Sequence, residues 1–80
     1  MKNLPIDKML CRLERRADFL GVKIDTDSRY IFICEAVAAF EFGEQLSYAF
    51  KENIYFKLRE LFQECNLDFN FALAEILMGE

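Results

Sequence analysis

Aromatic side chains are concentrated in residues 30–71, a stretch that contains no proline and a single glycine. This stretch holds eight of the nine phenylalanines and all three tyrosines of the chain. A long segment almost free of residues that interrupt helices fits helical structure. It also carries more apolar surface than the small core of an 80-residue chain encloses easily. We therefore expect part of this surface to contact a partner.

The overall composition supports the same expectation. Apolar residues make up 54% of the chain, against about 45–50% in an average domain, and this excludes an intrinsically disordered protein. A chain of this length forms one domain, so residues 1–80 are expected to fold together. Because so small a domain is marginally stable by itself, we expect a homodimer, or a complex with another protein, to cover the remaining apolar surface.

Residue types that carry chemistry are scarce. The chain has no histidine, and three isolated cysteines cannot complete a four-ligand zinc site, so we expect no metal, no cofactor and no enzymatic activity. Polar residues occupy the start of the chain, where a secretory leader would be apolar, and no segment approaches the roughly 20 apolar residues of a membrane span. We therefore expect a cytoplasmic protein with reduced thiols. The cysteines are Cys11, Cys34 and Cys65.

Apolar periodicity predicts a first helix over residues 5–20. Gly21, followed by apolar Val22, fits a left-handed helix end. Three consecutive polar residues at 25–27 are candidate caps for a second helix that begins near Ser28. The apolar positions of the first helix, at steps of three and four, are Ile6, Met9, Leu10, Leu13, Ala17 and Leu20.

The second predicted helix is apolar almost all round, so we expect it to be the most buried element of the fold. Its first residues, 30–34, are rich in aromatic and β-branched side chains, which leaves a short strand as the alternative. Gly43 marks either the end of this helix or a kink, so that the second and third helices are separate or form one bent helix.

A third helix is predicted from the apolar spacing of the following segment, with Ser47 or Asn53 as its cap. Asn66 fits a left-handed helix end, and Asp68 fits the cap of a last short helix over residues 69–78. The predicted fold is therefore all-α, a compact bundle of three main helices and a short C-terminal helix.

Eleven aromatic side chains cannot all point inward from helices that also expose polar faces. Phe69 and Phe71, for example, lie about 200° apart on a helix, so only one of them fits a given core. We expect the aromatics that remain outside to anchor a protein partner. The core candidates are Phe32, Phe40, Phe50, Phe56 and Phe62. The candidates for partner contact are Phe42, Tyr48, Tyr55, Phe69 and Phe71.

Charge is divided unevenly along the chain, whose net charge is −4. Residues 1–29 carry seven basic and five acidic side chains, whereas residues 30–80 carry three basic and nine acidic ones. The acidic part fits a basic protein surface, with Glu41 and Glu44 beside the candidate aromatics. The basic face of the first helix is either an ordinary solvated surface or a site for nucleic acid or an acidic protein. It consists of Lys8, Arg12, Arg15 and Arg16.

These features predict a small acidic protein without enzymatic activity that binds a larger protein and inhibits or modulates it. Its aromatic side chains and the carboxylates around them would mask a functional surface of the partner. Two alternatives remain. One is a dimeric nucleic-acid-associated regulator that uses the basic face of the first helix, and the other is a structural homo-oligomer that covers its own aromatic surface.

Overall fold

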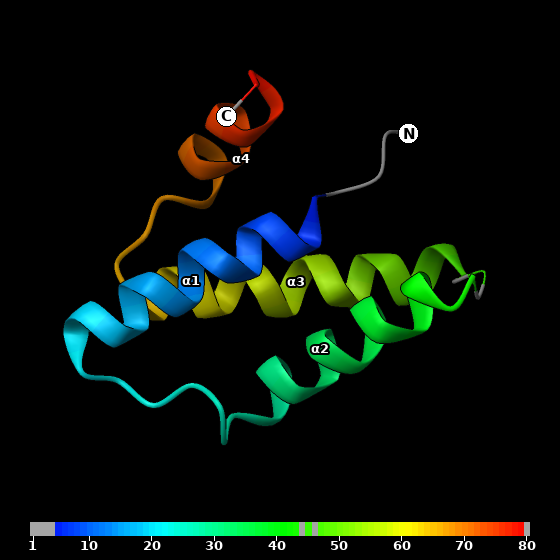
Figure 1. The fold of residues 1–80 in the computed structure, drawn as a ribbon, viewed down its shortest axis with the longest axis horizontal. Coiled ribbons are helices and arrows are strands. Elements are labelled where there is room, and N and C mark those ends of the chain that lie inside the picture. Colours follow the sequence, from blue (N-terminus) through cyan, green and yellow to red (C-terminus); the bar gives the residue numbers. More distant parts are fainter. Residues whose placement is uncertain (1–4, 44, 46, 80) are drawn as a thin grey trace.

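The computed structural model describes residues 5–43, 45 and 47–79, and the regular structure of these residues is entirely helical. The helices are α1 (Ile6–Leu20), α2 (Ser28–Glu41), α3 (Tyr48–Glu64) and α4 (Phe69–Leu77) (Figure 1). The predicted all-α bundle of three main helices and a short last helix is thus confirmed. Residues 30–34 lie within α2, so the alternative of a strand is wrong, and α2 and α3 are separate helices.

The helix ends follow local sequence signals. Gly21 ends α1 with a φ of 72°, and the amide of Val22 donates to the carbonyl of Ala17 at 2.8 Å, which completes a Schellman motif. Asn66, with a φ of 55°, adopts the left-handed conformation that was expected after α3. At the N-termini of α2, α3 and α4, the residue before the helix has a short polar side chain that accepts a hydrogen bond from a backbone N–H of the first turn. These caps are Asp27 for α2, Ser47 for α3 and Asp68 for α4.

Most of the core lies where α1, α3 and α4 meet, because each of these helices contacts the other two, and Ile33 and Ala36 of α2 belong to the same core. Met9 and Leu13 of α1, together with Leu58 and Phe62 of α3, are completely enclosed. Burial of a side chain of this size contributes about 1.5–3 kcal/mol to stability. This cluster is therefore the main source of stability in the fold.

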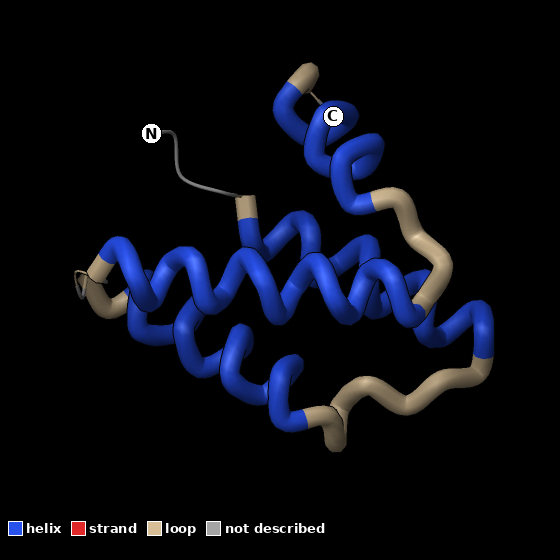
Figure 2. The backbone as a smooth tube through the Cα atoms, turned by 180° about the vertical axis from the view of Figure 1, so that it is seen from behind, coloured by secondary structure: helices blue, strands red, loops and turns tan. Residues whose placement is uncertain are grey.

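The prediction that α2 is the most buried element is wrong. Only Ile33 and Ala36 of α2 are buried, because α2 packs mainly on α3. Figure 2 shows α2 and α4 on opposite sides of α3, which makes α3 the central helix. A helix that is apolar all round does not specify which face is buried. The outer face of α2 consequently exposes Ile31, and Phe42 is exposed just after its last residue.

An ion-pair network fastens the start of α2 to the end of α3. The guanidinium of Arg29 lies 2.7 Å from the carboxylate of Asp27 and donates to Glu64 through both terminal nitrogens. These hydrogen bonds lower the pKa of Asp27 to about 2 and also lower the pKa of Glu64. The hydroxyl of Tyr30 donates to Glu14 and so links α2 to α1. Charged and polar groups therefore help to hold the start of α2.

The three cysteines are free thiols that differ in exposure. Cys11 on α1 is exposed, Cys34 on α2 is half-buried, and Cys65, directly after α3, is buried. Burial raises the pKa of the Cys65 thiol, because an ionised sulfur is disfavoured away from water.

Candidate functional site

Exposed aromatic side chains are the first candidates for partner contact. Phe42, Tyr48 and Phe71, three of the five predicted contact aromatics, are 87%, 66% and 64% exposed. Phe42 directly follows α2 and Tyr48 begins α3, so these two lie at the same end of the molecule. Phe71 belongs to α4, which is connected to the opposite end of α3 (Figure 1). The structure thus places Phe42 and Tyr48 at the same end of the molecule, whereas Phe71 lies on the helix connected to the other end of α3.

The prediction that Phe69 lies on the outside is wrong. This side chain is 5% exposed and packs edge-on against Tyr55 and Phe62, with ring centroids 5.0 and 5.4 Å away. As the first residue of α4, Phe69 points back to α3, whereas Phe71 points to the solvent. Tyr55 is half-buried by the same contact, and its hydroxyl accepts a hydrogen bond from Arg59 at 3.1 Å. Neither Phe69 nor Tyr55 offers a free ring to a partner.

The five phenylalanines predicted for the core differ in how far they are buried. Phe62 is fully enclosed, and Phe32 and Phe50 are half-buried against each other, with ring centroids 5.1 Å apart. Phe40 is 38% exposed and Phe56 is 65% exposed. The prediction for Phe56 is wrong because this residue lies about 120° around α3 from Phe62, on the solvent side of the helix.

Carboxylates accompany the two exposed aromatics at the junction of α2 and α3. Glu41 precedes Phe42 and is exposed, and a hydrogen bond to Glu52 raises the pKa of Tyr48. The predicted contact residue Glu44 lies outside the described residues. We call the surface formed by Glu41, Phe42, Tyr48 and Glu52 the α2–α3 end. It presents aromatic rings beside negative charge.

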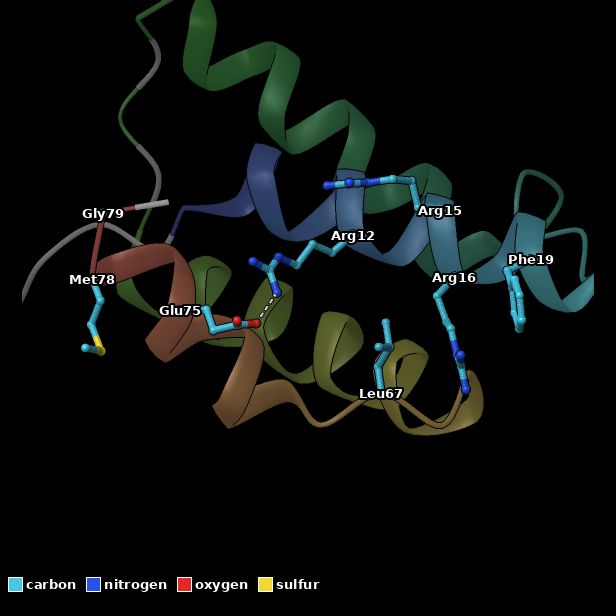
Figure 3. A pocket seen from close by; sticks show the side chains of 8 residues that line it. All are labelled: Arg12, Arg15, Arg16, Phe19, Leu67, Glu75, Met78 and Gly79. Atoms are coloured by element: carbon cyan, nitrogen blue, oxygen red, sulfur yellow. Dashed lines mark hydrogen bonds and ion pairs between the residues drawn. The ribbon is translucent and has the colours of Figure 1, made fainter.

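A second candidate site is the α1–α4 groove, an open hollow of about 800 Å³ between these two helices (Figure 3). Three of the four residues of the predicted basic face line it. The fourth, Lys8, lines a smaller hollow next to it that shares Arg12 and Arg15. The structure therefore gives the basic face a concave surface. The groove residues are Arg12, Arg15, Arg16, Phe19, Leu67, Glu75, Met78 and Gly79.

The described residues that line the α1–α4 groove carry a surplus of positive charge. Nη1 of Arg12 lies 2.6 Å from Oε1 of Glu75, in a pair that joins α1 to α4 (Figure 3). Among the described residues that line the groove, Glu75 is the single carboxylate and three are arginines. Arg15 is exposed and makes no hydrogen bond or ion pair with another described residue. Part of the positive charge is therefore available to a negatively charged ligand.

Arg16 is held in place at the other end of the groove. Its Nε donates to the carbonyl of Cys65 at 3.2 Å, at the end of α3, where helix carbonyls lack partners within the helix. Its guanidinium also lies 5.5 Å from the ring centroid of Phe19, a distance at which a cation is attracted to an aromatic face. Positive charge and an aromatic ring are thus presented side by side.

Phe19 and Met78 are the most exposed apolar side chains among the groove residues that sequence reasoning does not identify. Phe19 is 80% exposed and Met78 is 86% exposed. Phe19 follows Arg15 and Arg16 by four and three positions, so helical spacing alone places it on their side of α1. Met78 has no comparable signal, because only the folded chain brings α4 opposite α1.

Comparison with known proteins assigns no function to either surface. No family model matches the chain, and no curated protein or solved structure matches it. Within the described residues, no group of histidine, cysteine, aspartate and glutamate side chains is placed to hold a metal ion. None of the helices in the described part of the chain is long and apolar enough to span a bilayer.

Proposed function

We propose that this protein catalyses no reaction and acts by binding a larger protein through its α2–α3 end, masking part of the partner's surface. The observation that supports this proposal is the exposure of Phe42 and Tyr48, at 87% and 66%. Removing aromatic surface from water is favourable, and aromatic side chains are enriched at protein interfaces, where they often carry much of the binding energy.

Charge at the α2–α3 end favours a basic partner. Glu41 and Glu52 flank the two aromatics, and the net charge of −4 repels nucleic acid as a whole. Complementary charge accelerates association and is screened by salt, so the complex should weaken as ionic strength rises. Because the three cysteines are free thiols, we place this activity in a reducing compartment such as the cytoplasm.

The test compares the double variant Phe42→Ser/Tyr48→Ser with the control Phe56→Ser, which removes an exposed ring elsewhere on α3. Tagged wild-type and variant proteins are used to capture proteins from a nuclease-treated lysate of the cells that express the chain. We expect the wild type and the control to retain one stoichiometric partner and the double variant to lose it. Each single change should alter the free energy of unfolding by no more than about 0.5 kcal/mol, since the side chains are exposed.

Each other outcome points away from this proposal. Retention of the partner by the double variant would assign binding to a different surface. A chain that captures only itself, with a melting temperature that rises with protein concentration, would support the structural homo-oligomer. Binding that is seen only when the nuclease is omitted would favour the nucleic-acid-associated regulator, with the basic residues Lys8, Arg12, Arg15 and Arg16 as its contact surface.

A further inference from the structure

The α1–α4 groove has an exposed apolar side chain near each end and arginines along its length. Figure 3 shows Phe19 and Met78 at opposite ends of the groove, with Arg12 and Glu75 between them. Arg15 adds an exposed positive charge on α1. Arginine, methionine and aromatic residues are enriched at protein interfaces, and exposed methionine adapts to ligands of different shape.

We infer that the α1–α4 groove binds a short acidic segment of another protein, with carboxylates toward the arginines and an apolar side chain at each end. Glu75 already shows that a carboxylate fits here, since it pairs with Arg12 at 2.6 Å from within the chain. A second carboxylate, supplied by the ligand, would pair with Arg15 and offset the positive surplus. The apolar side chains of the ligand would cover Phe19 and Met78, which are 80% and 86% exposed.

The same features argue for a protein segment rather than nucleic acid. Interfaces with nucleic acid are more polar and much more positively charged than those between proteins, whereas Phe19, Leu67 and Met78 make this groove partly apolar. Affinity for nucleic acid also depends on neutralising several phosphates. In the groove, Arg12 is already paired with Glu75, and Arg16 is engaged by the Cys65 carbonyl. The net charge of −4 opposes a polyanion more strongly than a short acidic peptide.

A defined probe tests the inference directly. It is a fluorescein-labelled peptide of about 15 residues, long enough for four helical turns, with leucines near both ends and glutamates between them. One control peptide replaces the glutamates by glutamine, and another replaces the leucines by serine. A single-stranded DNA of similar length represents nucleic acid. We expect saturable binding of the acidic peptide, at least tenfold weaker binding of both control peptides, and weaker binding of the DNA.

Variants of the protein locate the site. Arg15→Glu should weaken peptide binding about tenfold, because it turns an attraction into a repulsion. Lys23→Glu is its matched control, since Lys23 is exposed beyond the end of α1 and does not line the groove. Phe19→Ser should also weaken binding severalfold, whereas Phe56→Ser should not. Glu75→Gln should strengthen binding severalfold, because it removes the negative charge that competes with the ligand.

The inference is independent of the proposed function, and the two can fail separately. The double variant Phe42→Ser/Tyr48→Ser should bind the peptide as the wild type does. Absence of saturable peptide binding up to about 1 mM would overturn the inference. Equal effects of Arg15→Glu and Lys23→Glu would also overturn it, because only net charge would then matter. Tighter binding of the DNA than of the acidic peptide would replace it with a nucleic-acid site.

Discussion

α1, α3 and α4 enclose the side chains that they share, whereas α2 leaves much of its apolar surface accessible. Met9, Leu13, Leu58 and Phe62 are fully enclosed in the first region, but in α2 only Ile33 and Ala36 are buried. This difference runs against composition, since α2 is more apolar than α1 or α3. Burial is therefore decided by how many neighbours surround a helix, and an apolar helix packed mainly on one neighbour keeps an exposed face.

The two regions also differ in the interactions that stabilise them. The enclosed cluster depends on apolar burial, which changes little with pH. The start of α2 depends in addition on the contacts of Arg29 with Asp27 and Glu64. Perturbations that act on packing and perturbations that act on charge should therefore separate the two regions.

The largest effect is expected from Phe62→Ala. This change removes a completely enclosed ring from the contact of α3 with α4, and such truncations cost about 3–5 kcal/mol. For so small a domain this is a large fraction of the total stability. Urea unfolding followed by circular dichroism measures the loss. A loss no greater than that caused by Ile33→Ala in α2 would break the comparison between the two regions.

Acid should act on the start of α2 before it acts on the enclosed cluster. The pKa of Asp27 falls from 3.8 to about 2 on folding, so its contribution is present above about pH 4 and disappears as the pH falls toward 2. The contribution is roughly 2 kcal/mol at most. Asp27→Asn should remove this part of the pH dependence of the unfolding free energy.

Asp25→Asn is the matched control for this measurement, because Asp25 is exposed in the same connector. It should leave the acid branch of the stability curve unchanged. Equal behaviour of the two variants would show that the Arg29 network does not hold α2.

Gly21 lies in the segment that connects α1 to α2. Gly21→Ala should lower the free energy of unfolding by about 1 kcal/mol. Gly21 has a φ of 72°, and an added Cβ would have no atom within 4 Å, so the cost comes from the backbone alone. Gly21→Asn should cost less, because asparagine tolerates this conformation, as Asn66 shows. Thermal unfolding of both variants provides the measurement, and a larger loss for asparagine than for alanine would contradict this explanation.

The smallest effect is expected from Phe56→Ser, on the same helix as Phe62. Because Phe56 is 65% exposed, the change should alter the free energy of unfolding by no more than about 0.5 kcal/mol. The pair sharpens the comparison, since two phenylalanines of α3 differ only in the side of the helix that they occupy. A loss of several kcal/mol would show that Phe56 is covered in solution, for example by a second copy of the chain.

Local features of the fold could be predicted from the sequence because each depends on neighbouring residues. Gly21, Ser47 and Asp68 end or begin helices through backbone conformation or a side chain that reaches the next turn. The apolar face of α1 could also be predicted, because Met9, Leu13 and Ala17 recur every four residues with charged residues between them. All three are buried. Helix number and type follow from such signals.

Tertiary features could not be predicted in this way. Phe69 and Phe71 have similar sequence surroundings, and only the contact of α4 with α3 decides that Phe69 is buried. The central position of α3 depends on how the helices assemble. The basic residues of the first helix were identified as a group, but the groove that they line required α4 to lie opposite them. Exposure of Phe42 and Tyr48 was predicted from crowding, since a small core cannot hold every ring.

Because the three thiols differ in exposure, their reaction with a thiol reagent reports local opening of the fold. A thiol reagent reaches Cys11 directly, reaches Cys34 in part, and reaches the buried Cys65 only when the surrounding residues separate. If reclosing is faster than labelling, the ratio of the Cys65 rate to that of an unfolded thiol equals the opening equilibrium constant at that site. Cys34 and Cys65 therefore allow the opening equilibria of α2 and of the enclosed cluster to be measured separately, without introducing a new cysteine.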